Sequence, residues 1–443
     1  MSINDNFEPA FNFITDESSI LLHSKPAEVH VSGNIYTGNA EVRMNLAPRA
    51  KIYLCSCFEN VPESLPMGIN FGKEKISSFK VAGHEIDGFS SGVGGSADDK
   101  TMTIKWSPAS EPLDGIVGNE SSQIYSVVFH LFNFLDVRDI QGHQVFNNFD
   151  LLNDEWEIKF NQIPQTGDNF KKIKSEGGCH LTHVGCIKKK DQTRFSGKVA
   201  NDFLIMLRYF LSFAYGAWCE PICPVGLDEH SNRVWESWSS PREIGARPST
   251  WFDEHHVFQL QKLFPGFVEK WKDADWRQTL REIIYWHTNA NNGQPIAIDA
   301  GIILTQAAIE RLSYEYAVES QRLISNDGFK KLRASDKFKL LFSSIDLPID
   351  IPIETPKLKQ LAKDNKINWF DAPHAITEVR NSLVHPAHKI RNKIEPVLYE
   401  AWNLGLWYLE LSILRICGYS GKYSNRLVNN KWVGTIEDVP WKD

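Results

Sequence analysis

The chain has 443 residues, of which 42% are hydrophobic and 23% are charged. This length predicts two or three domains, and the composition excludes extensive disorder. No run of about 18 uncharged apolar residues occurs, which argues against a transmembrane helix. Residues 1–8 have neither the basic nor the apolar part of a signal peptide. We therefore expect a cytoplasmic protein with no membrane partner.

The net charge of −7 excludes a generally basic nucleic-acid coat, but the charge is unevenly distributed. Residues 326–395 contain 13 Lys and Arg against 9 Asp and Glu, an excess of four positive charges, so the remainder of the chain carries −11. A mildly basic segment within an acidic protein is compatible with RNA binding without proving it.

Seven cysteines without a secretion signal predict reduced thiols. Cys179, His183 and Cys186, with Cys219 and Cys223 downstream, have donor types that bind zinc, but their spacing matches no standard zinc finger. Residues 179–187 also mix apolar and β-branched residues as a strand does, which favours ordinary small core side chains. We expect no metal and no cofactor.

The fold class expected is α+β with several domains, in which an antiparallel β-rich region precedes an all-helical bundle. Residues 1–175 contain strand-like segments separated by Gly and Asn turns, and residues 90–96 have the composition of a flexible loop. Residues 176–250 form a mixed segment that completes the β-rich region. It contains a buried helix at 201–211, capped by Asp202, and two strands at 218–227 and 233–238.

Residues 251–443 predict the helical bundle, because their apolar residues recur with a helical period. Its expected helices span 276–289, 296–323, a third segment capped by Asp371 and stopped by Pro386, and 395–417. A terminal hairpin around Asn429 and Asn430 should close the chain.

The third of these helices ends in Arg380-Asn381-Ser382-Leu383-Val384-His385. Arginine binds a phosphate through a fixed fork of donors, and histidine exchanges a proton near neutral pH. Together these residues suit metal-free cleavage of a phosphodiester. Asn381 and His385 lie on one helix face, but Arg380 is rotated by about 140° from His385, so two copies of the helix would complete a site most easily.

Spacing alone is weak support for this site, because similar pairs occur elsewhere. Arg138 and His143 have the same spacing but enclose Gly142 in the β-rich region. Arg281 and His287 lie on a helix, but Glu282 beside the arginine would repel a phosphate.

The motif Arg380-Asn381-Ser382-Leu383-Val384-His385 resembles the signature of HEPN-domain ribonucleases, and helices 251–417 are similar to the HEPN bundle. A β-rich region before such a bundle resembles the ApeA-like HEPN proteins of bacterial antiphage defence. The resemblance implies a metal-independent RNA-cleaving homodimer joined through the helical domain, with Arg380, Asn381 and His385 as catalytic residues. It also implies a role in abortive infection, with a phage component as the candidate trigger.

Each of these residues also has a purely structural explanation. His385 could cap or pack at a helix end, Arg380 could pair with Glu378 or Glu310, and Asn381 could bond the backbone. His388, Lys389 and Arg391 are candidates for RNA phosphate contacts, or form a solvated basic turn. Tyr285, Trp286 and Trp407 are expected in the core. The rival function is a non-catalytic HEPN sensor or scaffold whose β-rich domain binds a protein or a small ligand.

Overall fold

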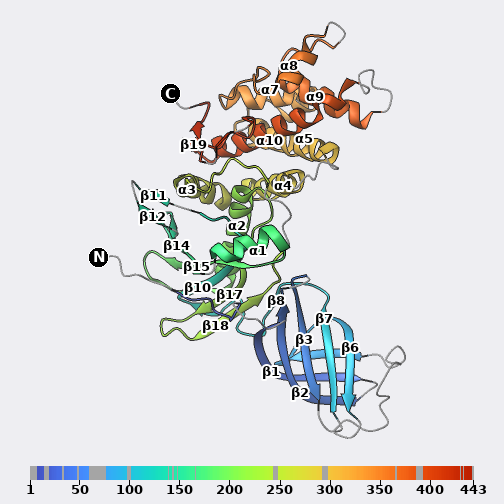
Figure 1. Cartoon of the computed structure of the whole chain (residues 1–443), viewed down its shortest axis with the longest axis vertical. Helices are drawn as coiled ribbons and strands as arrows, with labels where there is room; N and C mark the ends of the chain where they lie inside the picture. The colour runs from blue at the N-terminus through green and yellow to red at the C-terminus, as the bar shows by residue number, and fades with distance from the viewer. Residues whose placement is uncertain are drawn as a thin grey trace. The chain divides into compact units, whose positions relative to one another are not determined.

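The computed structural model describes most of the chain (Figure 1). The described residues are 7–13, 19–31, 34–46, 49–58, 76–96, 101–137, 139–141, 144–146, 148–164, 166–242, 248–291, 298–364, 367–385, 393–429, 431–432 and 434–441. They form a mixed α/β protein with two compact units. Unit 1 comprises residues 1–134, 155–204 and 221–243, and unit 2 comprises 135–154, 205–220 and 244–443. The chain therefore passes between the units several times.

Unit 1 contains the β-rich part of the chain. Its first sheet is antiparallel and curved, with the strand order β5-β4-β1-β2-β3-β7-β6 (Figure 1). The strands are β1 (Ile20–Val31), β2 (Asn34–Asn45), β3 (Lys51–Phe58), β4 (Ile76–Val81), β5 (His84–Glu85), β6 (Gly88–Ser96) and β7 (Thr101–Pro108). The predicted antiparallel β-rich region is therefore confirmed.

The second sheet of unit 1 contains six strands of this unit in the order β14-β15-β10-β17-β18-β8. They are β8 (Leu113–Asp114), β10 (Ser126–Phe132), β14 (Trp156–Gln162), β15 (Leu181–Lys189), β17 (Ile222–Leu227) and β18 (Arg233–Trp238). The strand β9 (Gln123–Ile124) pairs with β16 (Phe195–Ser196), and helix α1 spans Thr166–Glu176. One hydrophobic core joins side chains of both sheets, from Val29 and Val42 to Val128 and Val225.

Unit 2 is dominated by helices. They are α3 (Phe258–Lys272), α4 (Ala274–Asn291), α5 (Ile298–Tyr314), the π-helix η2 (Glu315–Ser320), α6 (Asn326–Lys331), α7 (Ala334–Ser344), α8 (Pro356–Ala362), α9 (Ala372–Val384), the 3-10 turn η4 (Glu395–Val397) and α10 (Leu398–Ile416). Helix α5 packs against α4, α7, α9 and α10. The short strands of this unit are β11 (Asp139–Gln141), β12 (Gln144–Phe146), β13 (Phe149–Leu152), β19 (Lys422–Tyr423) and β20 (Glu437–Asp438).

Helix α2 (Gly197–Tyr215) starts in unit 1 and ends in unit 2. The prediction that Asp202 caps this helix is wrong, because the helix begins five residues earlier. The Ser196 hydroxyl instead accepts a hydrogen bond from the Val199 amide at 3.3 Å, as an N-cap residue does.

Three other local predictions are wrong. Residues 90–96 are not a loop but belong to β6, because pairing with β7 outweighs their glycine content. The helix expected at 296–323 leaves the α-helical path after Tyr314. The terminal strands pair through Lys422–Tyr423 and Glu437–Asp438, wider apart than a turn at Asn429 and Asn430 requires, and Asn430 lies outside the described residues.

None of the helices among the described residues has both the length and the apolar character needed to cross a membrane.

Candidate functional site at the end of helix α9

Helix α9 positions the candidate site, and both of its ends follow from the sequence. The Asp371 carboxylate accepts a hydrogen bond from the His374 amide at 2.9 Å, and Pro373 lies in the first turn. The helix ends at Val384, and His385 has φ −108° and ψ 106°. The His385 amide still donates to the Asn381 carbonyl at 2.9 Å. The predicted cap is therefore confirmed, and His385 is held directly above Asn381.

The buried face of α9 determines which residues remain accessible. Ala375, Ile376, Val379 and Ser382 are buried, and the Gln306 amide donates to the Ile376 carbonyl at 2.6 Å. Because α9 also packs against α5, α7 and α10, this face cannot rotate outward. The opposite face carries the polar residues of the motif.

The three motif side chains lie close to the surface at one end of α9. Arg380 and Asn381 are half-buried, and His385 is exposed. The Arg380 guanidinium donates to Asn381 Oδ1, and Asn381 Nδ2 donates to Glu378 Oε1, both at 3.4 Å. The long Arg380 side chain therefore turns toward Asn381, which stands one helical turn before His385.

Arg380 makes no ion pair with another side chain in the part of the chain that the structure describes. Glu310, one of its expected partners, is instead bound by Lys337 at 2.5 Å. The imidazole of His385 has no hydrogen-bond partner among the described residues. Among the described residues neither side chain takes part in an ion pair, and arginine and histidine are residue types that can bind and cleave a phosphodiester.

The predicted phosphate contacts at His388, Lys389 and Arg391 lie outside the described residues, as does Pro386. The coincidental match formed by Arg138 and His143 also lies outside them.

The looser match, Arg281 to His287, leads to a buried charged network that sequence reasoning missed. His287 Nε2 lies 3.1 Å from Glu410 Oε1, and Arg426 binds both oxygens of the same carboxylate at 2.7 and 3.0 Å. The three side chains are at most 2% exposed. Burial alone would raise the pKa of Glu410, but Arg426 and His287 outweigh it and hold that pKa below its ordinary value. Because no solvent reaches it, this network has a structural role.

The cysteine and histidine group predicted as a weak zinc candidate is dispersed in the fold. Within the described ranges, no three Cys, His, Asp or Glu side chains form a cluster that could hold a metal ion. Burial raises the pKa of the Cys219 and Cys223 thiols.

Of the three aromatic residues expected in the core, one is buried, one is half-buried and one is exposed. Trp407 is 4% exposed and donates from its indole to the Tyr423 hydroxyl at 3.1 Å, so that prediction is confirmed. Trp286 is half-buried. Tyr285 is 49% exposed, so its assignment to the core is wrong.

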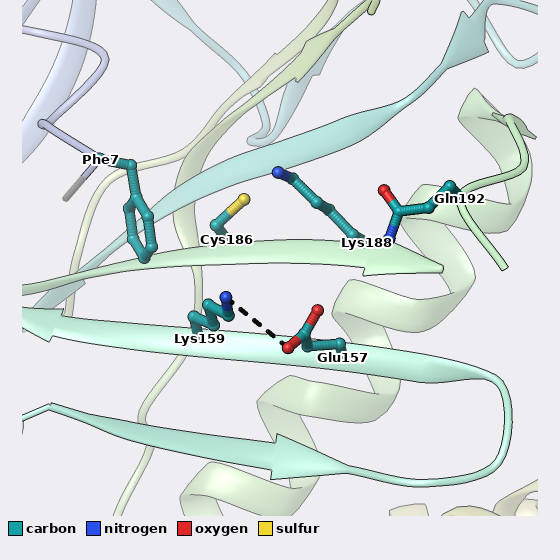
Figure 2. Close-up of a pocket in the computed structure, with 6 residues that line it drawn as sticks. All are labelled: Phe7, Glu157, Lys159, Cys186, Lys188 and Gln192. Atoms are coloured by element: carbon teal, nitrogen blue, oxygen red, sulfur yellow. Dashed lines mark ion pairs between the residues drawn. The ribbon is translucent and has the colours of Figure 1, made fainter. Parts of the chain in front are cut away.

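A separate hollow of about 110 Å³ lies in unit 1 over strands β14 and β15. Figure 2 shows its lining residues, which are Phe7, Glu157, Lys159, Cys186, Lys188 and Gln192. Lys159 pairs with Glu157 at 3.7 Å, and Lys188 lies 5.8 Å from the centre of the Tyr125 ring. The lining of the hollow thus combines two lysines and one glutamate with the ring of Phe7.

Comparison with known proteins places this chain in a family. The family model of the YopA central domain matches residues 119–248, and that of the YopA C-terminal domain matches residues 273–438. The SPbeta prophage-derived uncharacterized protein YopA of Bacillus subtilis (strain 168) is 30% identical over 341 residues, which are 74% of each chain. The chain belongs to the YopA family. No solved structure matches it.

The two YopA matches show which part of the family contains the candidate site. Arg380, Asn381 and His385 all lie inside the YopA C-terminal match, which extends from α4 to β20. The YopA central match contains the strands from β9 to β18. Strands β1 to β8 lie outside both matches. Because its three residues lie within 273–438, the candidate site belongs to the family's C-terminal domain.

Proposed function

We propose that this protein is a metal-independent endoribonuclease of the HEPN type. One observation carries the proposal: at the exposed end of α9 the Arg380 guanidinium bonds Asn381, whose carbonyl accepts the His385 amide, and Arg380 has no competing ion pair among the described residues. The helical part of unit 2 supports the same assignment, because HEPN proteins are helical bundles.

In the proposed reaction, His385 removes the proton from a ribose 2′-hydroxyl group. The resulting oxygen attacks the adjacent phosphorus, and the bond from phosphorus to the 5′-oxygen breaks. Arg380 stabilises the negative charge that develops on the phosphoryl oxygens, and Asn381 orients the phosphate. The 5′-oxygen leaves with a proton from solvent. The products carry 2′,3′-cyclic phosphate and 5′-hydroxyl ends, and DNA resists because it lacks the attacking hydroxyl group.

The proposal includes a homodimer joined through the helical domain, with two α9 helices across one groove. The rotation of about 140° between Arg380 and His385 favours such a shared site. The bond from Arg380 to Asn381 also permits a site within one chain. The apolar residues of α10 give no support to a dimer through this helix, because Leu404, Leu406, Trp407, Leu409 and Leu411 are all buried within unit 2.

A role in antiphage defence by abortive infection belongs to the same proposal, with RNA as substrate and a phage component as trigger. Its support is the origin of a relative, because the Bacillus subtilis protein is described as prophage-derived. A ribonuclease in such a setting would stop phage production by degrading RNA in the infected cell.

The decisive experiment is incubation of the purified full chain with a mixed RNA pool in EDTA, followed by end-group analysis. His385→Ala and Arg380→Ala should each lower the cleavage rate by roughly 10² to 10⁴ without unfolding the protein. Exposed matched controls, His230→Ala and Arg333→Ala, should cleave normally. Sedimentation of the same samples gives the assembly state. Cleavage that needs a divalent metal, or full activity of the folded His385→Ala variant, contradicts the proposal.

The hollow over β14 and β15 favours a second candidate function, in which the β-rich part recognises a small ligand. A folded wild-type protein that leaves the RNA pool intact would favour this sensor function over catalysis.

A further inference from the structure

An aromatic pair lies at the opposite end of α9 from the catalytic motif. The rings of Phe370 and His374 are stacked, with centroids 5.2 Å apart and an interplanar angle of 18°. Phe370 is 77% exposed, whereas its neighbour Trp369 is 6% exposed and anchors the chain in the core. An exposed phenylalanine held against a second ring offers an accessible flat surface.

The pair is held in place by the same residues that begin the helix. The His374 amide donates to Asp371 Oδ1 at 2.9 Å, and the Phe370 amide approaches His374 Nδ1 at 3.4 Å. Lys339 binds the other oxygen of Asp371 at 2.9 Å and adds a positive charge beside the helix start. The ring surface is therefore preorganised, which lowers the entropy cost of binding.

His374 of the aromatic pair lies on the same face of α9 as Asn381 and His385. Asn381 and His385 follow His374 by seven and eleven residues, which places all three within about 20° of one direction around the helix. The distance along the axis from His374 to His385 is about 16 Å, from the α-helical rise per residue. A ligand that touches both ends must therefore extend over several chemical units, as a short single strand of nucleic acid does.

We propose that Phe370 and His374 form a base-stacking platform for single-stranded RNA whose scissile phosphodiester lies at Arg380 and His385. This inference rests on the proposed ribonuclease function and names its substrate class. Stacking requires a base with an open face, which an unpaired nucleotide offers and a duplex does not.

The charges along α9 indicate how the strand lies. Glu378 is between the platform and the motif, and its carboxylate accepts the Asn381 amide. A carboxylate repels phosphates, so the sugar–phosphate backbone should follow the Arg380 side of the helix. The bases then face the side with His374. Replacing Glu378 with glutamine should accordingly strengthen RNA binding.

The test measures binding of a short single-stranded RNA that contains 2-aminopurine, with all variants made in a His385→Ala background to prevent turnover. Phe370→Ala should weaken binding roughly tenfold and abolish quenching of the 2-aminopurine fluorescence, because a base–aromatic stack is lost. Phe370→Tyr should restore both. Trp432→Ala removes an aromatic residue that is 87% exposed outside α9, and it should bind like the parent.

The outcomes separate this inference from the proposed function. If the wild-type protein cleaves RNA but Phe370→Ala binds as well as Trp432→Ala, the platform is overturned and the ribonuclease assignment stands. If RNA is not cleaved but binding depends on Phe370, the ribonuclease assignment fails and the platform stands. Equal binding of duplex and single-stranded RNA would also overturn the platform.

Discussion

His130 is a fully buried histidine that links two segments of unit 1. Its Nδ1 donates to the Ile222 carbonyl, and its Nε2 accepts the Ala10 amide, both at 2.9 Å. Burial lowers the pKa of His130 to about 4, because the charged ring loses its solvation, and this effect outweighs the hydrogen bond to Ile222, which favours the charged form. Between pH 6.5 and 4, the unfolded chain binds a proton here that the folded chain does not. The stability from His130 is therefore complete above pH 6.5 and is lost as the pH falls to 4.

Acidification from pH 6.5 to pH 4 should accordingly destabilise unit 1 through this residue by about 3.5 kcal/mol, taking about 1.4 kcal/mol for each pKa unit of the shift. Urea unfolding of the wild-type protein and of His130→Gln at pH 7 and pH 4.5 measures the effect. The variant should be less stable at pH 7, because it loses a well-fitted ring, but less sensitive to pH. An equal loss of stability in both proteins on acidification would rule out His130 as the titrating group.

Single residues also mark how far the candidate site could be predicted. Asp371 and Pro373 in the sequence located the start of α9 correctly, since capping and proline geometry are local effects. The contact from Arg380 to Asn381 could not be predicted, because a long side chain has many rotamers and tertiary packing selects one. The same is true of Phe370, whose exposed stack on His374 depends on the buried Trp369 beside it.

Among the elements, the segment after α10 is attached to the bundle by the buried charge network. Arg426 binds Glu410 on α10, and its guanidinium also donates to Asn291 Oδ1 on α4 at 3.0 Å and to the Ser249 carbonyl at 2.7 Å. Removing one partner of a buried ion pair leaves an uncompensated charge without solvent. The network therefore makes the C-terminal segment part of the folded bundle.

Glu410→Gln should lower the free energy of unfolding by about 3 to 5 kcal/mol, because Arg426 then loses its counter-charge. The matched control is Asp346→Asn, which breaks the exposed pair with Arg415 at 2.7 Å and should cost less than about 1 kcal/mol. Denaturant titration of both variants makes the comparison. Since the pKa of Glu410 is lowered, the wild-type advantage should be complete above about pH 4.5 and disappear as the pH falls further. Equal costs for both variants would show that the network contributes no more than a surface pair.

The type of an element could be predicted where its apolar residues recur with a strong period. The prediction was wrong where pairing with another strand determines the structure. Helix α4 and strand β15 follow their sequence patterns closely. Strand β6 was mistaken for a loop, since its glycines carry no strand signal and only the ladder with β7 holds it extended. The first turn of α2 was missed because Gly197 opens it and Ser196, not Asp202, supplies the cap.

At the scale of the whole molecule, unit 2 depends on a segment far from its helices in the sequence. Residues 205–220 contribute aromatic side chains of α2 to its core. The Phe210 ring lies 5.2 Å from Phe264 and 5.3 Å from Phe267. Phe213 stacks on Trp251 at 5.4 Å, and the Trp251 indole donates to the Phe213 carbonyl at 3.2 Å. The boundary expected near residue 250 could not reveal this contribution, because a long-range contact leaves no periodic signal in either segment.

A fragment of residues 251–443 should therefore fail to unfold cooperatively, whereas a fragment of residues 196–443 should gain cooperative unfolding because it restores α2. Thermal unfolding followed by near-ultraviolet circular dichroism compares the two. In the full chain, Phe210→Ala should cost about 3 to 5 kcal/mol, because it leaves a cavity between Phe264 and Phe267. Val199→Ala on the same helix is the control: its side chain is 39% exposed, and it should cost less than about 0.5 kcal/mol. Cooperative unfolding of 251–443 alone would contradict the prediction, since the helices would then form their core without the aromatic side chains of α2.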